Sequence, residues 1–419
     1  MKTKAIKLLV GAALLLPLQA AHASNDASGD EPSPEVVEMQ RKMITLDTHL
    51  DTPASLDLPG WSIMDRHDVH TDFTQVDLPR MKQGELDGGF WAIYTPQGPL
   101  DAEHYAQVRD FAVLRGMSIR MMVAAHPDQF ELALKADDAA RINAEGKRIV
   151  FMSIENAYPL GEDVSLLKLF YKMGVRETGF AHFRNNQFAD SSTDPDGPKW
   201  HGLSPLGLQM LAEANKLGMI IDASHSSDEV LDQLIAKSTT PVVLSHSGCK
   251  AIYDHPRNVD DARLRALAAK GGVIQINSYG SYLRAHKPNP QRDAAMGALF
   301  STMREDAKMT PEAYHAYLAK RREIDAKYPD TDRPTFDDFM KHLLHALKVV
   351  GPDHVGIGMD WDGGGGVAGL EDASQLPKIT AALLKAGYTK DDIAKIWGGN
   401  ILRVMRQVEA AADPKALES

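Results

Sequence analysis

Cysteine is nearly absent from this 419-residue sequence, in which Cys249 is the single example. One cysteine cannot form an intrachain disulfide, so a small disulfide-bonded scaffold is excluded. A chain of this length can bury a large apolar core without such links. The length suits either one large α/β barrel or two smaller domains.

An excess of positive charge is also lacking, because the chain has 46 lysines and arginines against 57 aspartates and glutamates. The formal net charge is −11. Nucleic acids and anionic membrane surfaces attract proteins with an excess of basic residues. We therefore expect neither a nucleic-acid partner nor a polybasic membrane patch.

Long hydrophobic runs are missing except near the N-terminus, where residues 8–18 are apolar and follow Lys2, Lys4 and Lys7. This run is too short to span a bilayer comfortably, so an uncleaved anchor is the weaker interpretation. Ala21-His22-Ala23 offers small residues at the positions that a signal peptidase reads. We expect a signal peptide over 1–23, a flexible lead-in over 24–34 and a secreted protein, in a bacterial periplasm because disulfides are absent. The polar C-terminus and the lack of a cysteine at the cleavage point predict no stable membrane anchor.

A glycine-rich turn after the first expected strand, typical of open doubly wound sheets, is absent as well. Short β-type runs alternate instead with amphipathic helical stretches, which predicts a parallel sheet, and eight such units predict a (β/α)8 TIM-type barrel of the α/β class. The eight expected strands are Ile44–Asp47, Gly89–Tyr94, Ile149–Ile154, Glu177–Ala181, Met219–Ala223, Pro241–Ser245, Val273–Asn277 and Val355–Met359. We expect residues 35–419 to form this single domain, with a helical insertion at about 284–347 after strand seven.

Histidines and carboxylates fall at the C-terminal ends of these strands, which form the catalytic face of such a barrel. Each residue alone is more often a structural or surface group than a ligand. Together they converge on one point, where burial without a cation would be costly. The residues are His49, Asp51, Glu155, His182, His225, His246 and Asp360.

Three imidazoles and two carboxylates from such a set provide nitrogen and oxygen ligands that suit Zn²⁺ best. Co²⁺, Mn²⁺ and Fe²⁺ are the alternatives. Five ligands are too many for one tetrahedral catalytic ion that keeps an open position, so we expect two divalent ions about 3.5–4 Å apart with a shared activated water.

Several strings in chain order resemble the membrane (renal) dipeptidase family over nearly the whole chain beyond residue 23. They include Asp47-Thr48-His49-Leu50-Asp51-Thr52-Pro53, Ile221-Asp222-Ala223-Ser224-His225, Ser245-His246-Ser247, Arg257-Asn258-Val259-Asp260 and Gly358-Met359-Asp360-Trp361-Asp362-Gly363. The resemblance implies a two-zinc barrel hydrolase that cleaves dipeptides.

The resemblance also implies individual roles. It makes His49 and Asp51 ligands of one ion, His225 and His246 ligands of the other, and Glu155 the carboxylate that bridges them. It makes His182 a substrate contact that polarises the developing oxyanion, and Arg257 the group that binds the substrate's terminal carboxylate. It makes Asp360 a proton carrier that also contacts substrate. Tyr279 is expected either to line the pocket or to pack in the core.

Two rival functions stay open at this point. One is a related amidohydrolase that acts on a β-lactam, a lactone or an N-acyl amino acid, whose carboxylates Arg257 could also bind. The other is a non-catalytic periplasmic metal- or peptide-binding protein, against which Asp360 speaks because a binder needs no proton carrier. A homodimer is compatible with the sequence. Asn156, Gly248-Cys249-Lys250 and the long insertion depart from the family pattern and leave side-chain preference open.

Overall fold

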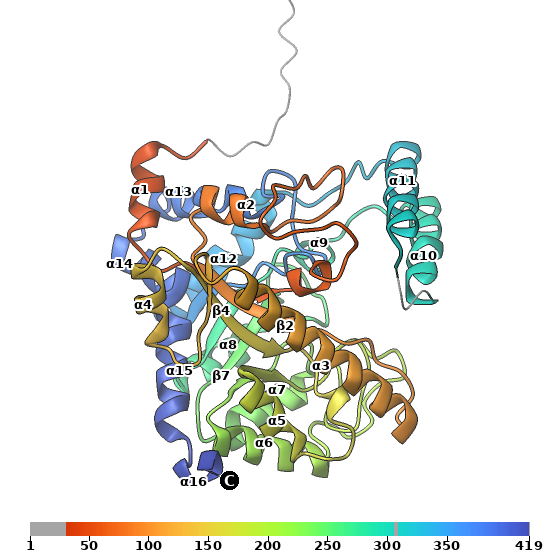
Figure 1. Ribbon diagram of the computed structural model, residues 1–419. Helices are drawn as coiled ribbons and strands as arrows, with labels where there is room; N and C mark the ends of the chain where they lie inside the picture. The colour runs from red at the N-terminus through yellow and green to blue at the C-terminus, as the bar shows by residue number, and fades with distance from the viewer. Residues whose placement is uncertain (1–30, 306–308, 419) are drawn as a thin grey trace, which may run out of the picture.

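A computed structural model describes residues 31–305 and 309–418 of the chain (Figure 1). The expected signal peptide, 1–23, and residues 24–30 of the expected lead-in lie outside the described residues. Within the described part, no helix combines the length and the apolar character needed to cross a membrane.

Eight parallel strands form the central sheet in the order β1-β2-β4-β5-β6-β7-β9-β10. The predicted barrel is thereby confirmed. The strands are β1 (Leu46–Leu50), β2 (Gly88–Ile93), β4 (Arg148–Ile154), β5 (Val175–Gly179), β6 (Ile220–Asp222), β7 (Val242–Cys249), β9 (Val273–Ile276) and β10 (Val355–Ile357), and two short strands, β3 (Phe130–Leu132) and β8 (Asn258–Val259), pair at the sides of β4 and β7.

The two ends of the sheet meet where β10 approaches β1. The backbone nitrogen of Asp51 donates to the carbonyl of Trp361 at 2.9 Å, just beyond both strands. The Asp47 carboxylate accepts from the nitrogen of Met359 at 3.1 Å. These contacts bring the first and last strands together, so their C-terminal ends contribute to the same site.

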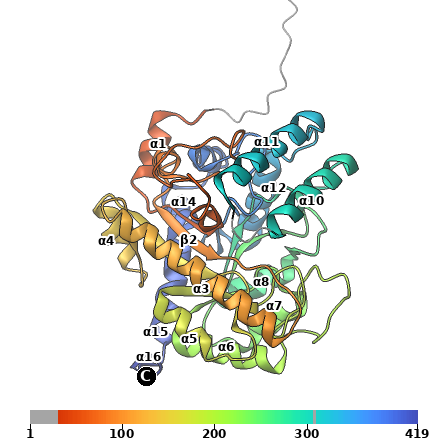
Figure 2. The ribbon, with the colours of Figure 1, turned by 45° about the vertical axis from the view of Figure 1, so that its right-hand side comes forward.

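The helices surround the sheet, as in other barrels of this class (Figures 1 and 2). The larger ones are α3 (Ala102–Ala125), α5 (Leu166–Met173), α6 (Pro205–Leu217), α7 (Asp228–Lys237), α8 (Asp261–Ala269), α12 (Phe336–Val350), α13 (Pro377–Lys385) and α15 (Asn400–Ala411). Further helices are α1 (Pro34–Arg41), α2 (Leu78–Gln83), α4 (Asp138–Ala144), α9 (Gly280–Leu283), α14 (Lys390–Ala394) and α16 (Pro414–Glu418).

Helix α15 closes the end of the barrel at which the strands begin. Its apolar residues Ile401, Val404 and Met405 are buried against the inward-facing side chains near the strand starts, such as Leu46 and Val243. This apolar layer fills the lower half of the barrel and leaves the opposite end for polar side chains.

The segment predicted as an insertion, about 284–347, contains two kinds of helix. Helices α10 (Pro290–Glu305) and α11 (Pro311–Lys327) stand outside the ring at the upper edge (Figures 1 and 2). Helix α12, by contrast, buries Phe339, Leu343 and Ala346 in the main core and contacts β7, β9 and β10. It therefore serves as the crossover helix between β9 and β10.

Two predicted strand ends differ from the observed ones in a way that matters for the site. Strand β1 runs to Leu50 rather than Asp47, and β7 runs to Cys249 rather than Ser245, so His49 and His246 lie within strands. The pairing register of β1 shifts between Asp47 and Leu50, and that of β7 shifts between Leu244 and Ser247. Such irregularities re-aim side chains near active sites, and hydrophobic pattern alone does not reveal them.

Candidate metal centre

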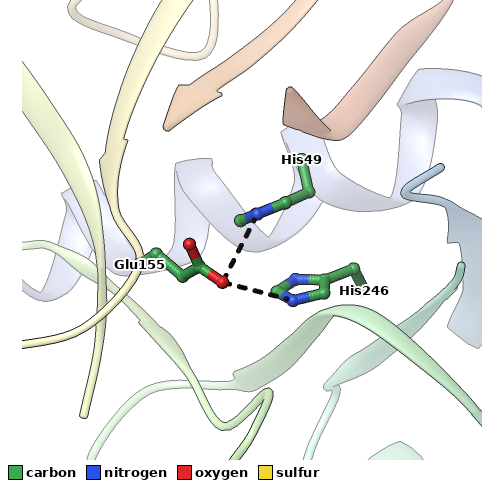
Figure 3. A group of neighbouring side chains, drawn as sticks. All are labelled: His49, Glu155 and His246. Atoms are coloured by element: carbon green, nitrogen blue, oxygen red, sulfur yellow. Dashed lines mark ion pairs between the residues drawn. The ribbon is translucent and has the colours of Figure 1, made fainter. Parts of the chain in front are cut away.

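Glu155, directly after β4, is the centre of a buried cluster of imidazoles. Its Oε1 atom lies 3.2 Å from Nε2 of both His182 and His225. The same atom lies 3.8 Å from Nε2 of both His49 and His246. Figure 3 shows the carboxylate directed at the last two rings. The structure therefore brings one carboxylate oxygen within reach of four imidazoles from four different strand ends.

A second carboxylate group adjoins this cluster. Asp51 Oδ2 lies 3.4 Å from His49 Nε2, and the ligand atoms of His49, Asp51 and Asp360 lie within 4.8 Å of one another. A Cβ atom added to Gly363 would lie 2.0 Å from Asp51 Oδ2 and 2.3 Å from Asp360 Oδ1. Glycine at this position thus permits the two carboxylates to approach each other.

Two of the cluster residues have an unusual backbone. His225 and Asp360 have φ values of 65° and 62°, in the left-handed region that residues with a side chain seldom adopt. Each lies three residues past the end of its strand, β6 or β10. Such a conformation persists only where the surroundings stabilise it, and it is concentrated at functional sites.

Hydrogen bonds behind the cluster orient His246. The Ser245 hydroxyl donates to Asp222 Oδ2 at 2.6 Å and lies 2.9 Å from His246 Nδ1. Because that single proton goes to the carboxylate, the hydroxyl accepts from Nδ1–H, and Nε2 presents a lone pair to the cluster. Partners of this kind fix the ring orientation of metal-binding histidines.

Asp222 and Asp47 are functional residues that the strand-end argument missed. Asp47 accepts the backbone nitrogen of His49 at 3.0 Å and so holds the turn of chain that carries this histidine. Both aspartates lie two or three residues before a cluster histidine, in the strings Asp47-Thr48-His49 and Asp222-Ala223-Ser224-His225. For Asp47, two residues before His49 on the same strand, the alternation of side chains was the signal that could have identified it. Asp222 is three residues before His225, so alternation gives no such signal for it.

Each charged group in the cluster shifts the pKa of its neighbours. Burial raises the pKa of Glu155, but the surrounding His182, His225 and His49 hold it well below the usual value. Burial lowers the pKa of His49, yet Asp51, Glu155 and Asp360 raise it well above normal.

Asp360 and the other two histidines shift in the opposite directions. Burial, with Asp51 and Glu155 adding to it and His49 opposing it, raises the pKa of Asp360 well above normal. Burial, reinforced by positive neighbours that include Arg257, lowers the pKa of His225 and His246 well below normal. A lowered pKa favours the neutral imidazole, the form in which histidine binds a metal ion.

The donor set fits divalent metal ions. His49 Nε2 and Asp51 Oδ1 are buried and have no hydrogen-bond partner among the described residues, although buried polar atoms almost always have one. The candidate groups His49, Glu155 and His246, and Glu155, His182 and His225, share Glu155. His182 lies as close to Glu155 as His225 does, so the cluster offers one more imidazole than the five-residue ligand set requires.

Arg257 lies behind the cluster and is 3% exposed. Its guanidinium donates to the His246 carbonyl at 3.0 Å and to the Ser247 hydroxyl at 3.3 Å, and it lies 5.1 Å from the centre of the Tyr282 ring. Its Nε is buried and unpartnered. The structure therefore places this cation next to a predicted metal ligand.

A cavity of about 1230 Å³ opens above the cluster. Asp51, Glu155, His182, His225 and Asp360 line its floor, and Tyr279 lines its wall, stacked on Tyr282 with ring centres 4.5 Å apart. His49, His246 and Arg257 lie beneath this surface. The cavity gives a substrate direct access to the cluster.

Comparisons with known proteins point to one family of peptidases. The family described as membrane dipeptidase (peptidase family M19) matches residues 34–419. Dipeptidase tcpJ of Claviceps purpurea is 34% identical over 349 residues, which cover 82% of this chain and 71% of that protein. The crystal structure of the probable dipeptidase PvdM from Pseudomonas aeruginosa has a TM-score of 0.76 and 31% identity and covers 90% of this chain and 98% of its own. The crystal structure of dipeptidase AC, a metallopeptidase, has a TM-score of 0.70 and 25% identity and covers 87% and 99% of the two chains.

Proposed function

Because this chain belongs to the membrane dipeptidase family, peptidase family M19, and is a metal-dependent dipeptidase, we propose that it cleaves dipeptides with two divalent ions, preferably Zn²⁺. The observation that carries the proposal is the position of Glu155 Oε1, within 3.8 Å of four imidazole nitrogens. One carboxylate surrounded in this way can serve two ions.

In this proposal His49 and Asp51 hold one ion, His225 and His246 hold the other, and Glu155 contributes to both. The unpartnered His49 Nε2 and Asp51 Oδ1 support the first assignment, and the lowered pKa of His225 and His246 supports the second. When bound, such ions lower the pKa of a water molecule and polarise the scissile carbonyl.

The remaining side chains have substrate-directed roles. Burial raises the pKa of Asp360 well above its usual value, which makes its carboxylate a stronger base that takes a proton from the attacking water and passes it to the leaving amine. His182, on the cavity floor, donates to the developing oxyanion. Arg257, beneath the floor of the cavity, attracts the terminal carboxylate towards that floor, and Tyr279 bounds the space beside Asp360.

The test combines metal analysis with a substrate panel. Protein never exposed to chelator should contain about two divalent ions per chain. It should hydrolyse dipeptides, lose this activity on dialysis against chelator, and regain it with Zn²⁺, Mn²⁺ or Co²⁺. N-acetyl amino acids, a β-lactam and a lactone form the comparison set.

One ion per chain in fully active protein would rule out the two-ion assignment. Faster turnover of the comparison set than of any dipeptide would favour another amidohydrolase. A Glu155→Gln variant should bind less metal while unfolding as one cooperative domain, which separates loss of the site from loss of the fold.

A further inference from the structure

The cavity above the cluster is larger than a dipeptide needs. Its volume of about 1230 Å³ exceeds the roughly 300–1,000 Å³ that is typical of sites for much larger ligands. Helices α10 and α11 and the segment that contains Phe73 form its outer wall. The outer part can therefore receive a portion of the substrate beyond the two amino-acid backbones.

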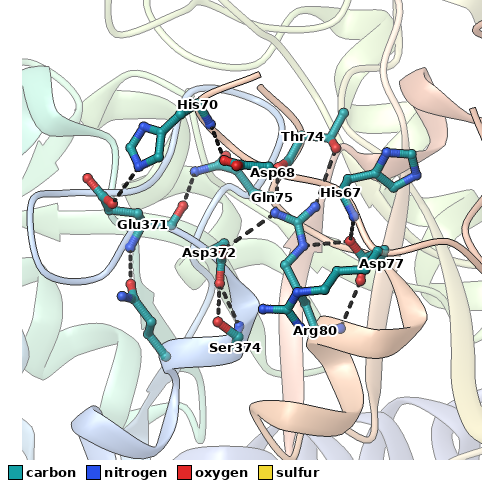
Figure 4. A network of polar contacts seen from close by, with 12 residues as sticks. His67, Asp68, His70, Thr74, Gln75, Asp77, Arg80, Glu371, Asp372 and Ser374 are labelled. Atoms are coloured by element: carbon teal, nitrogen blue, oxygen red, sulfur yellow. Dashed lines mark hydrogen bonds and ion pairs between the residues drawn. The ribbon is translucent and has the colours of Figure 1, made fainter. Parts of the chain in front are cut away.

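The segment that carries Phe73 is held in place by a polar network (Figure 4). The fully buried Arg80 donates to the carbonyl of Thr74 and to Asp77, both at 2.6 Å. Gln75 donates to the carbonyl of Glu371 at 2.9 Å. Phe73 itself has a φ of 67°, a conformation that these neighbours must maintain. The Phe73 ring therefore has a defined position in the cavity wall.

Arg321 of α11 lies over the Phe73 ring. Its guanidinium carbon is 3.7 Å from the centre of the Phe73 ring, and one terminal nitrogen is 3.5 Å from the Tyr317 hydroxyl. Its Nε is buried without a hydrogen-bond partner. The ring contact orients the guanidinium and leaves most of its donors unused.

The other arginines of the cavity wall already have strong acceptors. Arg292 pairs with Asp325 at 2.6 Å, and Arg333 pairs with Glu371 at 2.7 Å. Arg322, next to Arg321, donates to the carbonyl of Thr71 at 2.6 Å. Among the described residues, Arg321 is the cavity arginine that pairs with neither a carboxylate nor a carbonyl.

We infer that Arg321, supported by Phe73 and Tyr317, forms a distal subsite for a carboxylate on the side chain of the substrate's N-terminal residue. A guanidinium matches a carboxylate in charge and in planar geometry. The inference rests on the proposed function, in which Arg257, beneath the cavity floor, draws the C-terminal carboxylate inward and so leaves the N-terminal side chain directed outward. The substrate class is a dipeptide whose first residue carries an additional acidic group.

Matched acid and amide substrates test this subsite. The first pair is Glu-Ala and Gln-Ala. The second pair is Lys-Ala with a succinyl group on Nζ, as the acid, and the same compound with the succinyl carboxylate converted to an amide. The succinyl-lysine side chain is longer and extends further from the scissile bond. We expect wild-type kcat/KM to favour the acid of at least one pair by about 3- to 30-fold, as for a partly desolvated ion pair. Arg321→Met should reduce this ratio to about one, and Arg321→Lys should retain part of it.

Arg322→Met is the matched control, because it removes an adjacent α11 arginine that anchors the helix to Thr71. It should keep the wild-type ratio. Calorimetric titration with free Nζ-succinyl-lysine and its amide reads the same preference without turnover.

Each ratio is taken within one protein, so differences in folding or metal loading cancel. A wild type without acid preference in either pair, a preference that survives in Arg321→Met, or an equal loss in Arg322→Met would overturn the subsite. Failure to hydrolyse any dipeptide, with the calorimetric preference intact, would instead contradict the proposed function.

Discussion

Arg257 combines near-complete burial with incomplete hydrogen bonding. Two of its nitrogens are committed to His246 and Ser247, whereas Nε has no partner. A buried cation is costly unless an anion balances its charge. The terminal carboxylate of a dipeptide is the anion that the proposed reaction supplies.

Replacing Arg257 with alanine should therefore impair catalysis far more than folding. Truncating one member of such a pair costs about 2–5 kcal/mol, which corresponds to a fall of about one and a half to three and a half decades in kcat/KM. Arg257→Lys should recover only part of this loss, because an ammonium lacks the planar fork. The measurement is kcat/KM for a dipeptide and for its C-terminal amide.

The amide comparison decides what Arg257 recognises. Wild type should prefer the free acid, and Arg257→Ala should lose that preference while it retains its metal. Arg263→Ala, which removes a surface arginine paired with Asp232 and Asp260, is the control. Equal cleavage of acid and amide by wild type would refute the carboxylate role.

At the residue scale, the sequence predicted which side chains gather but not how they are held. The placement of histidines and carboxylates at strand ends follows from parallel topology and was predictable. The chain from Asp222 through Ser245 to His246 was not, because serine and aspartate are common in strands and loops alike. The contact of Arg321 with Phe73 joins helix α11 to the segment before α2, and no pattern of hydrophobic residues in the sequence relates these two segments.

At the scale of elements, Asp87 ties together the starts of three strands. It precedes β2, and its carboxylate accepts from the nitrogen of Thr45, just before β1, at 2.9 Å. It also accepts from Arg148, the first residue of β4, at 3.2 Å. Burial, only partly opposed by these donors, raises the pKa of Asp87 to about 6.

This shift makes the stability of the strand starts depend on pH. The folded-state pKa lies above the unfolded value, so the native protein binds the proton more tightly. The resulting stabilisation is fully present below about pH 4 and is lost as pH rises through about 6, a difference of at most about 3 kcal/mol. The asparagine side chain of Asp87→Asn does not titrate, so this variant lacks this contribution to the pH dependence of stability.

Urea unfolding at about pH 4.5 and about pH 7.5 measures the effect. The free energy of unfolding of wild type, relative to Asp87→Asn, should be higher at the lower pH. Taking the difference between the two proteins removes the shared pH dependence of metal binding. Asp110→Asn, on the exposed face of α3, controls for the loss of one acidic group. An unchanged difference across the two pH values contradicts the prediction.

Element existence was easier to predict than element ends. The eight main strands follow from apolar runs of sufficient length, whereas β3 and β8 were missed because two or three residues carry no recognisable pattern. The 284–347 segment was predicted as one charged helical insertion, which overlooked the apolar face that carries Phe339 and Leu343 of α12 and packs on the barrel. Helices α10 and α11 lack such a face.

At the scale of the whole molecule, the described fold begins close to the expected processing site. Helix α1 starts at Pro34, and the proposed cleavage after Ala23 would leave a short lead-in before it. We propose that the chain is exported, with Ser24 as the first residue of the mature protein.

N-terminal sequencing of protein recovered from the periplasmic fraction of a bacterial host should therefore begin at Ser24. Ala23→Asp should block cleavage, because the peptidase requires a small residue there. An export-competent chain that retains Met1 would contradict this assignment. Lys82→Met, on the exposed surface of α2, leaves the signal sequence unchanged and serves as the control.

The apolar layer between α15 and the strand starts also closes that end of the barrel to substrate and products. With that end filled by Ile401, Val404 and their neighbours, substrate enters and both products depart through the mouth of the cavity. In the proposed orientation the C-terminal amino acid lies innermost, so it leaves second. Ordered release makes the C-terminal amino acid a competitive inhibitor with respect to the dipeptide. The N-terminal amino acid, which leaves first, is then a mixed inhibitor.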